Sequence, residues 1–112
     1  MRIALGQLAS GADIRANLAA IDRFAGEAAR DGAALVAFPE YATYEKKKVD
    51  ATFPAGAEPL DGPVCRELAA IARRHRIALV AGVVVLALIT RGFKAAPPEM
   101  AATEKATVEA AA

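Results

Sequence analysis

Short apolar runs and helical repeats alternate along the first 84 residues of the chain. Arg2–Leu8 alternates imperfectly between polar and apolar positions, whereas Ala34–Phe38 and Ile77–Val84 are almost wholly apolar. Alternation is typical of a strand with one covered face, and a short apolar run is typical of a buried parallel strand. The pattern therefore predicts three strands over these ranges, the last running to Val84 or a little beyond.

An amphipathic helix is predicted between the first two strands. Asp13 can cap its start with a side-chain oxygen, and Gly32 can end it in the left-handed conformation that glycine tolerates. Charged residues fall largely on the opposite side from an apolar stripe at helical spacing. This stripe consists of Ile14, Leu18, Ile21, Phe24 and Ala28.

A second helix is predicted between the second and third strands. It begins at Asp61-Gly62-Pro63, since proline is tolerated in a first helical turn. Its buried stripe consists of Val64, Leu68, Ile71 and Ala72. The resulting β-α-β-α-β order predicts the α/β class: a three-stranded parallel sheet, right-handed crossovers and two main helices on one face.

The pattern changes after Val84. Ile77–Ile89 is an unbroken run of apolar residues and glycine, but a membrane-spanning helix needs about 20 such residues. No apolar period is sustained over Arg91–Ala112, although Pro97-Pro98-Glu99 could start a helix through Ala111. We expect two regions: residues 1–84 as a domain part, and residues 85–112 as an atypical alanine-rich tail that is partly disordered unless it docks.

Composition narrows the function classes. Lys and Arg number 14 against 13 Asp and Glu, so a net charge of +1 leaves no electrostatic footprint for nucleic acid. One cysteine excludes an internal disulfide and favours a reducing compartment. The N-terminus lacks the long apolar core of a signal peptide. We therefore expect a cytoplasmic protein with no membrane partner.

Glu40 is the candidate catalytic residue. Proline cannot donate to a sheet ladder, so Pro39 ends the second strand and places Glu40 just past its carboxyl end. Active sites of open α/β sheets lie beyond these ends. A neighbouring hydrophobic core would partly bury Glu40 and suit it to act as a general base. A solvated loop carboxylate after an ordinary strand is the alternative.

Other chemistry-bearing residues are weaker candidates. Cys65 and His75 fall on one predicted helix about 15 Å apart, so they cannot meet as nucleophile and base. We interpret Cys65 as a small apolar filler and His75 as a polar residue near the helix end. Lys46-Lys47-Lys48 is interpreted as a solvated face, because no glycine-rich segment accompanies it. The turn after the first strand also lacks the glycines of a nucleotide-binding βαβ unit.

The first 84 residues resemble the start of the nitrilase, or carbon–nitrogen hydrolase, superfamily. The resemblance rests on four segments in the same order and spacing, of which the Phe-Pro-Glu stretch is the most specific. They are Arg2–Leu8, Asn17-Leu18 with Ile21, Gly32–Glu40, and Gly62-Pro63 leading to Ile77–Val84. The resemblance implies part of an α-β-β-α sandwich and cofactor-free hydrolysis of nitriles, amides or N-carbamoyl groups by a Glu-Lys-Cys triad. Glu40 matches the general-base glutamate.

The match to the triad stops at Glu40. No segment of this sequence resembles the family's lysine or nucleophile segments. Lys94 is too close to the third strand, and Cys65 lies on the wrong element. This pattern predicts a truncated product, or a reading-frame change after about Val84, that is inactive alone and takes an amide or nitrile substrate only if the site is completed. The alternative is a non-catalytic oligomerising or binding module, because an uncovered sheet face favours self-association.

Overall fold

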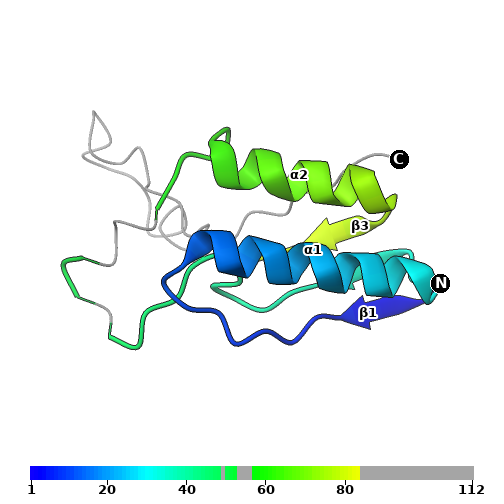
Figure 1. Ribbon diagram of the computed structural model, residues 1–112, viewed down its shortest axis with the longest axis horizontal. Coiled ribbons are helices and arrows are strands. Elements are labelled where there is room, and N and C mark those ends of the chain that lie inside the picture. The colour runs from blue at the N-terminus through cyan, green and yellow to red at the C-terminus, as the bar shows by residue number, and fades with distance from the viewer. Residues whose placement is uncertain (49, 53–56, 84–112) are drawn as a thin grey trace, which may run out of the picture.

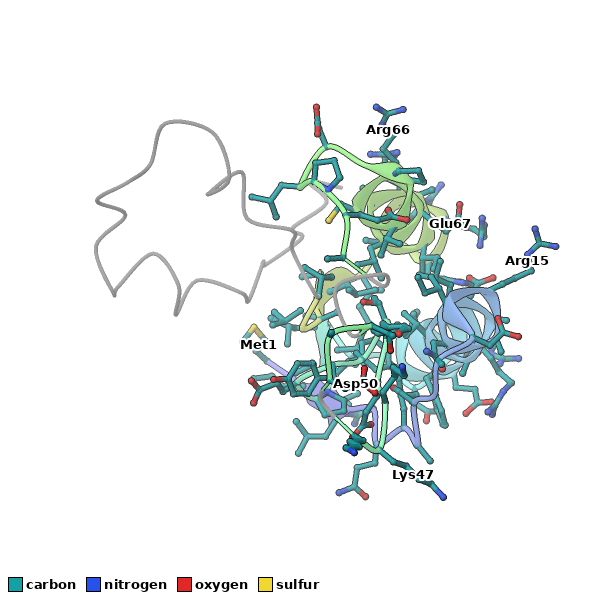
Figure 2. The ribbon with its side chains drawn as sticks, turned by 90° about the vertical axis from the view of Figure 1, so that its left-hand side faces the viewer. Met1, Arg15, Lys47, Asp50, Arg66 and Glu67 are labelled. Carbon is teal, nitrogen blue, oxygen red and sulfur yellow. The ribbon has the colours of Figure 1, made fainter. Side chains whose placement is uncertain are left out.

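A parallel sheet with helices on one of its faces organises the protein. A computed structural model describes residues 1–48, 50–52 and 57–83. Along the chain, the elements are β1 (Ile3–Leu5), α1 (Ile14–Arg30), β2 (Leu35–Ala37), α2 (Pro63–His75) and β3 (Ala78–Val80). The strands pair in the order β1-β2-β3, and both neighbouring pairs are parallel. Figure 1 shows α1 and α2 side by side, and the end-on view of Figure 2 shows both on the same side of the sheet.

This architecture confirms the predicted α/β class, the parallel pairing and the two helices on one face. The third strand's continuation past Val83 and everything predicted for residues 85–112, Lys94 included, lie outside the described residues. In the described part of the chain, neither helix is long and apolar enough to cross a membrane.

The strands are shorter than their apolar runs predicted. β2 ends at Ala37 because Phe38 is followed by Pro39, which has no N–H for a ladder. β1 then ends at Leu5, since Gly6 makes the last ladder bond, from its N–H to Ala37 O at 2.8 Å. The carboxyl ends of the strands therefore meet close to Pro39.

α1 has the predicted signals at both ends. Asp13 accepts a hydrogen bond from Ala16 N at 3.0 Å and so caps the first turn. Gly32 has a φ of 80°, and its N–H donates to Ala29 O at 3.0 Å while Ala33 N donates to Ala28 O at 2.9 Å. These two bonds form a Schellman motif, which satisfies carbonyls that the helix end leaves open.

α2 begins at Pro63, as predicted, after Gly62. Its end is a left-handed residue that is not glycine: Arg76 has a φ of 53°. The bond from Ile77 N to Ala72 O, at 3.1 Å, closes the turn and sends the chain directly into β3. The predicted stripe is buried at all four positions, Val64, Leu68, Ile71 and Ala72.

The core lies between the sheet and the helices. Parallel register aligns Ala4, Val36 and Leu79 across the sheet, and Val36 and Leu79 are buried among the helix stripes. Fully burying a Leu, Ile or Val side chain contributes about 1.5–3 kcal/mol, so each buried side chain of this layer stabilises the fold. The alternate positions point to the other face of the sheet: Ile3, Leu35 and Ala78 in one row, Leu5, Ala37 and Val80 in the next.

Candidate functional site

Glu40 lies in the turn that follows β2, at the carboxyl edge of the parallel sheet. Phe38 is buried, whereas Pro39 and Glu40 are exposed. The expected partial burial of Glu40 is therefore wrong for this chain, because the carboxylate lies past the last buried side chain of the strand run. The next residue, Tyr41, has a φ of 59°, so the chain turns sharply there.

The segment after this turn is held by the loop between β1 and α1 and by Asn17 of α1. Asn17 is buried, and its Nδ2 donates to Gly11 O at 2.7 Å and to Thr43 O at 2.9 Å, while its Oδ1 accepts from Gly11 N at 3.1 Å. Ser10 Oγ donates to Ala42 O at 2.9 Å. The two loops at this edge of the sheet are thus joined by Ser10 and Asn17, and both the oxygen and the nitrogen of the Asn17 amide have hydrogen-bond partners.

Asn17 is part of the family resemblance, but its role as a link between loops was not predicted from the sequence. The available signal was its position: Asn17 falls between Ile14 and Ile21 at helical spacing, on the side of α1 that faces the core. A polar residue there needs internal hydrogen-bond partners, which the loops provide.

Cys65 has the properties of a structural residue. It lies in the first turn of α2 and packs, partly buried, against the hydrophobic core. Burial raises the pKa of the Cys65 thiol, and the negative charge of Glu58 raises it further. A nucleophilic cysteine needs the opposite, a pKa lowered by nearby positive charge. This agrees with its interpretation as an apolar filler.

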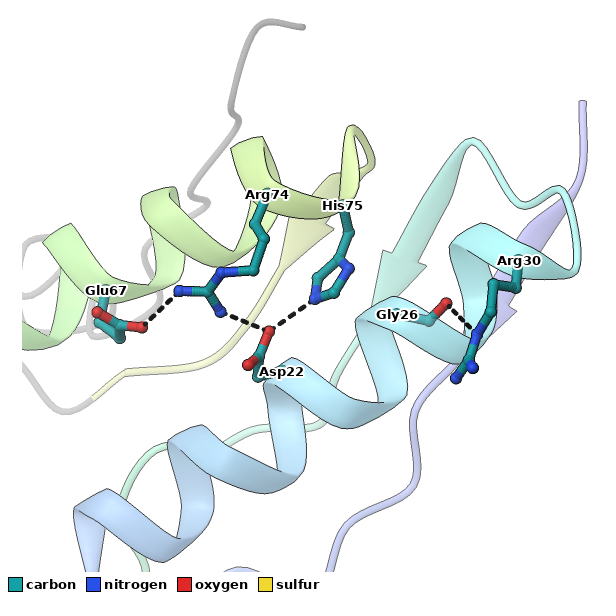
Figure 3. A network of polar contacts seen from close by, with 6 residues as sticks. All are labelled: Asp22, Gly26, Arg30, Glu67, Arg74 and His75. Carbon is teal, nitrogen blue, oxygen red and sulfur yellow. Dashed lines mark hydrogen bonds and ion pairs between the residues drawn. The ribbon is translucent and has the colours of Figure 1, made fainter.

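His75 belongs to a polar network between the helices (Figure 3). Its Nε2 lies 2.6 Å from Asp22 Oδ1, and Arg74 Nη1 donates to the same oxygen at 2.7 Å. Arg74 also approaches Glu67, with 3.5 Å between Nη2 and Oε1. The ring fits because Gly26 on α1 has no side chain: a Cβ there would lie 3.0 Å from His75 Cε1. The network joins α1 to α2 rather than forming a catalytic pair with Cys65.

Partial burial by itself would raise the pKa of Asp22, but the hydrogen bonds from His75 and Arg74 outweigh it and lower that pKa below its ordinary value. This network was not predicted from the sequence. His75 and Asp22 are 53 residues apart, and only the packing of the two helices brings them together.

The described residues offer no metal site, since no three His, Cys, Asp or Glu side chains gather there in a suitable cluster. The expectation of cofactor-free chemistry stays a prediction. Of the three consecutive lysines, Lys47 and Lys48 are exposed, as a solvated face predicts. Lys46 is half-buried, and its Nζ lies 3.6 Å from Asp50 Oδ1, so it forms an ion pair with a residue four positions along the chain.

A carboxylate at the carboxyl edge of a parallel sheet, with helices behind it, is an arrangement typical of α/β enzymes. The sequence matches the family profile described as carbon-nitrogen hydrolase over residues 2–96. The chain therefore belongs to the carbon–nitrogen hydrolase family, as its resemblance implied.

Individual relatives agree with this assignment. Hydrolase MT0498 and Hydrolase Rv0480c, both from Mycobacterium tuberculosis, are 43% identical to the chain over 82 residues, which cover 73% of the chain and 28% of each relative. The crystal structure of an amidase from Nesterenkonia sp. superposes with a TM-score of 0.63 at 37% identity, over 74% of the chain and 32% of the amidase. The chain thus spans about 28% of the length of the curated relatives it matches.

Proposed function

We propose that this chain is the part of an amide-hydrolysing carbon–nitrogen hydrolase that supplies the general base, and that Glu40 is this base. The observation that carries the proposal is the position of Glu40, in the turn directly after the central strand, where the carboxyl ends of the strands meet. The Phe38-Pro39-Glu40 segment resembles the family's general-base segment. The name of the Nesterenkonia relative, an amidase, favours an amide as the substrate class.

In such a site the carboxylate accepts the proton of a cysteine thiol, and the thiolate attacks the carbon of the scissile carbon–nitrogen bond. A lysine ammonium stabilises the negative charge that develops on the substrate. Of the three triad segments, only the glutamate segment has a resembling counterpart within these 112 residues. Cys65 does not replace the nucleophile, because the pKa of its thiol is raised and it lies on α2.

We therefore expect no amide or nitrile turnover by the purified 112-residue chain, and no change in Glu40→Gln, because a base without its thiol contributes little. The measurement is product release from a panel of simple amides and nitriles. Turnover that disappears in Cys65→Ala would overturn the reading and make Cys65 the nucleophile.

A complementation assay tests the base directly. The C-terminal part of the Nesterenkonia amidase is mixed with this chain, and the same substrates are assayed. We expect turnover with the wild-type chain and a loss of at least about 100-fold with Glu40→Gln, the usual contribution of a general base. Equal turnover with both chains would remove Glu40 from the mechanism.

A second candidate function is a non-catalytic association module. It is supported by the sheet face turned away from the helices, whose register positions are all apolar. Ile3 is 52% exposed and Leu5 is 78% exposed on this face. Contiguous apolar surface of this kind favours self-association. Sedimentation of the dilute chain tests this candidate.

A further inference from the structure

We propose that Gly82 is a positioning residue for Glu40: the absence of a side chain at Gly82 lets the segment just after β3 approach the turn after β2 and fixes the backbone that carries the carboxylate. The proposal rests on the proposed function for the importance of Glu40, but the positioning itself is a structural claim and can be measured without turnover.

The approach of Gly82 to the turn is too close for any other residue. A Cβ built on Gly82 would lie 2.8 Å from Glu40 Cα, 2.9 Å from Tyr41 N and 3.1 Å from Pro39 O. All three are backbone atoms, so no side chain can rotate away to make room. The Gly82 N–H also points at Pro39 O, at 3.4 Å. A methyl group at position 82 would therefore displace the backbone of Glu40 itself.

The turn has little freedom to give way elsewhere. Tyr41 holds a left-handed φ of 59°, a conformation that costs free energy for a residue with a Cβ and so depends on its surroundings. On the far side, Ser10 holds Ala42 O and Asn17 holds Thr43 O. The segment is thus confined between the residues that follow β3 on one side and Ser10 and the start of α1 on the other. The displacement caused by a larger residue at position 82 falls on Pro39, Glu40 and Tyr41.

Gly82→Ala in the 112-residue chain tests the proposal by NMR. We expect changed amide shifts at Glu40 and Tyr41 and a changed carboxyl carbon shift for Glu40. The matched control is Gly11→Ala, because a Cβ on Gly11 would meet nothing within 4 Å. This control should leave these shifts as they are in the wild type. Unchanged amide shifts at Glu40 and Tyr41 and an unchanged Glu40 carboxyl shift in Gly82→Ala would overturn the proposal.

Loss of stability alone is not the expected signature. Leu68→Ala removes a fully buried side chain from α2, so it should lower the melting temperature without moving the Glu40 carboxyl shift. If Leu68→Ala moved the Glu40 carboxyl shift as much as Gly82→Ala does, the shift would report lost packing in general. That result would overturn the positioning role of Gly82. If Gly82→Ala does not fold, the wild type still decides: a nuclear Overhauser effect between Gly82 Hα and the Tyr41 amide is expected, and its absence overturns the proposal.

The complemented enzyme separates this inference from the proposed function. There we expect Gly82→Ala to lower kcat about tenfold or more with little change in KM, because the base is displaced while substrate contacts remain. Activity that survives Glu40→Gln would defeat the proposed function, yet the NMR result for Gly82 would stand. Conversely, unchanged NMR shifts of the turn in Gly82→Ala would overturn the positioning role of Gly82, and the proposed role of Glu40 as the general base would remain.

Discussion

Asp22 shows how one residue joins the two helices. One of its carboxylate oxygens accepts hydrogen bonds from His75 and Arg74 of α2, and the absence of a side chain at Gly26 leaves room for the imidazole. Because these hydrogen bonds lower the pKa of Asp22, its charged form stabilises the fold. A group of this kind contributes stability above its unfolded pKa, and the contribution is lost as the pH falls through the lower, folded value.

We expect Asp22→Asn to lower the free energy of unfolding by about 1 kcal/mol near pH 7, a value kept small because the carboxylate is partly exposed and screened. The difference from wild type should shrink as the pH falls below about 3.9, the ordinary pKa of aspartate. Urea denaturation at several pH values measures it. Asp61→Asn is the control, since Asp61 is exposed and forms no ion pair with the described residues. A pH-independent loss in Asp22→Asn would contradict the linkage.

At the scale of elements, local signals were sufficient for the helices. Asp13, Gly32 and the Gly62-Pro63 pair lie at the helix boundaries where the sequence predicted them. Capping and backbone conformation depend on a few neighbouring residues, so they can be recognised without knowing the fold. Strand lengths depend instead on whether a partner strand continues. β1 ends at Leu5 because its partner β2 ends at Ala37, just before Phe38 and Pro39.

The N-cap of α1 offers a direct test of this local control. Asp13→Ala removes the acceptor for Ala16 N and should lower the free energy of unfolding by about 1 kcal/mol. Asp13→Ser keeps a capping oxygen and should retain most of the stability. Chemical denaturation followed by circular dichroism compares the three proteins. Equal stability of the alanine and serine variants would show that the cap contributes nothing here.

For the molecule as a whole, the two faces of the sheet differ. One face is buried under α1 and α2, whereas the other carries only apolar residues in the described strands and leaves Leu5 78% exposed. Burying such a face releases about 25 cal/mol for each Å² removed from water, which favours association of chains. Self-association therefore stays a prediction, and the surface expected to mediate it is the sheet face turned away from α1 and α2.

Leu5→Lys should shift the sedimentation of the dilute chain toward the monomer, because a charge on this face opposes burial. Leu60→Lys is the matched control: Leu60 is also exposed, at 59%, but lies in the turn before α2 and not on the sheet. A wild-type chain that sediments as a stable monomer with cooperative unfolding would remove the association module. An equal effect of both variants would point to a general effect of charge.

The sequence by itself determined the order of the elements, the α/β class, the buried stripes of the helices and the position of Glu40 after a strand. These features follow from hydrophobic period, caps and proline, which act over a few residues. The family assignment added the chemistry that Glu40 is proposed to perform, which no local pattern could supply.

Only the tertiary structure decided what surrounds these residues. It exposed Glu40, placed Gly82 against the turn, joined Asn17 to two loops and paired His75 with Asp22. The contacts of Gly82 with the turn, of Asn17 with Thr43 and of His75 with Asp22 join segments far apart in the chain. A polar or glycine residue carries no local mark of the partner it will meet. The partner is set by how the helices and strands pack, because close packing of the whole molecule determines which distant atoms come together.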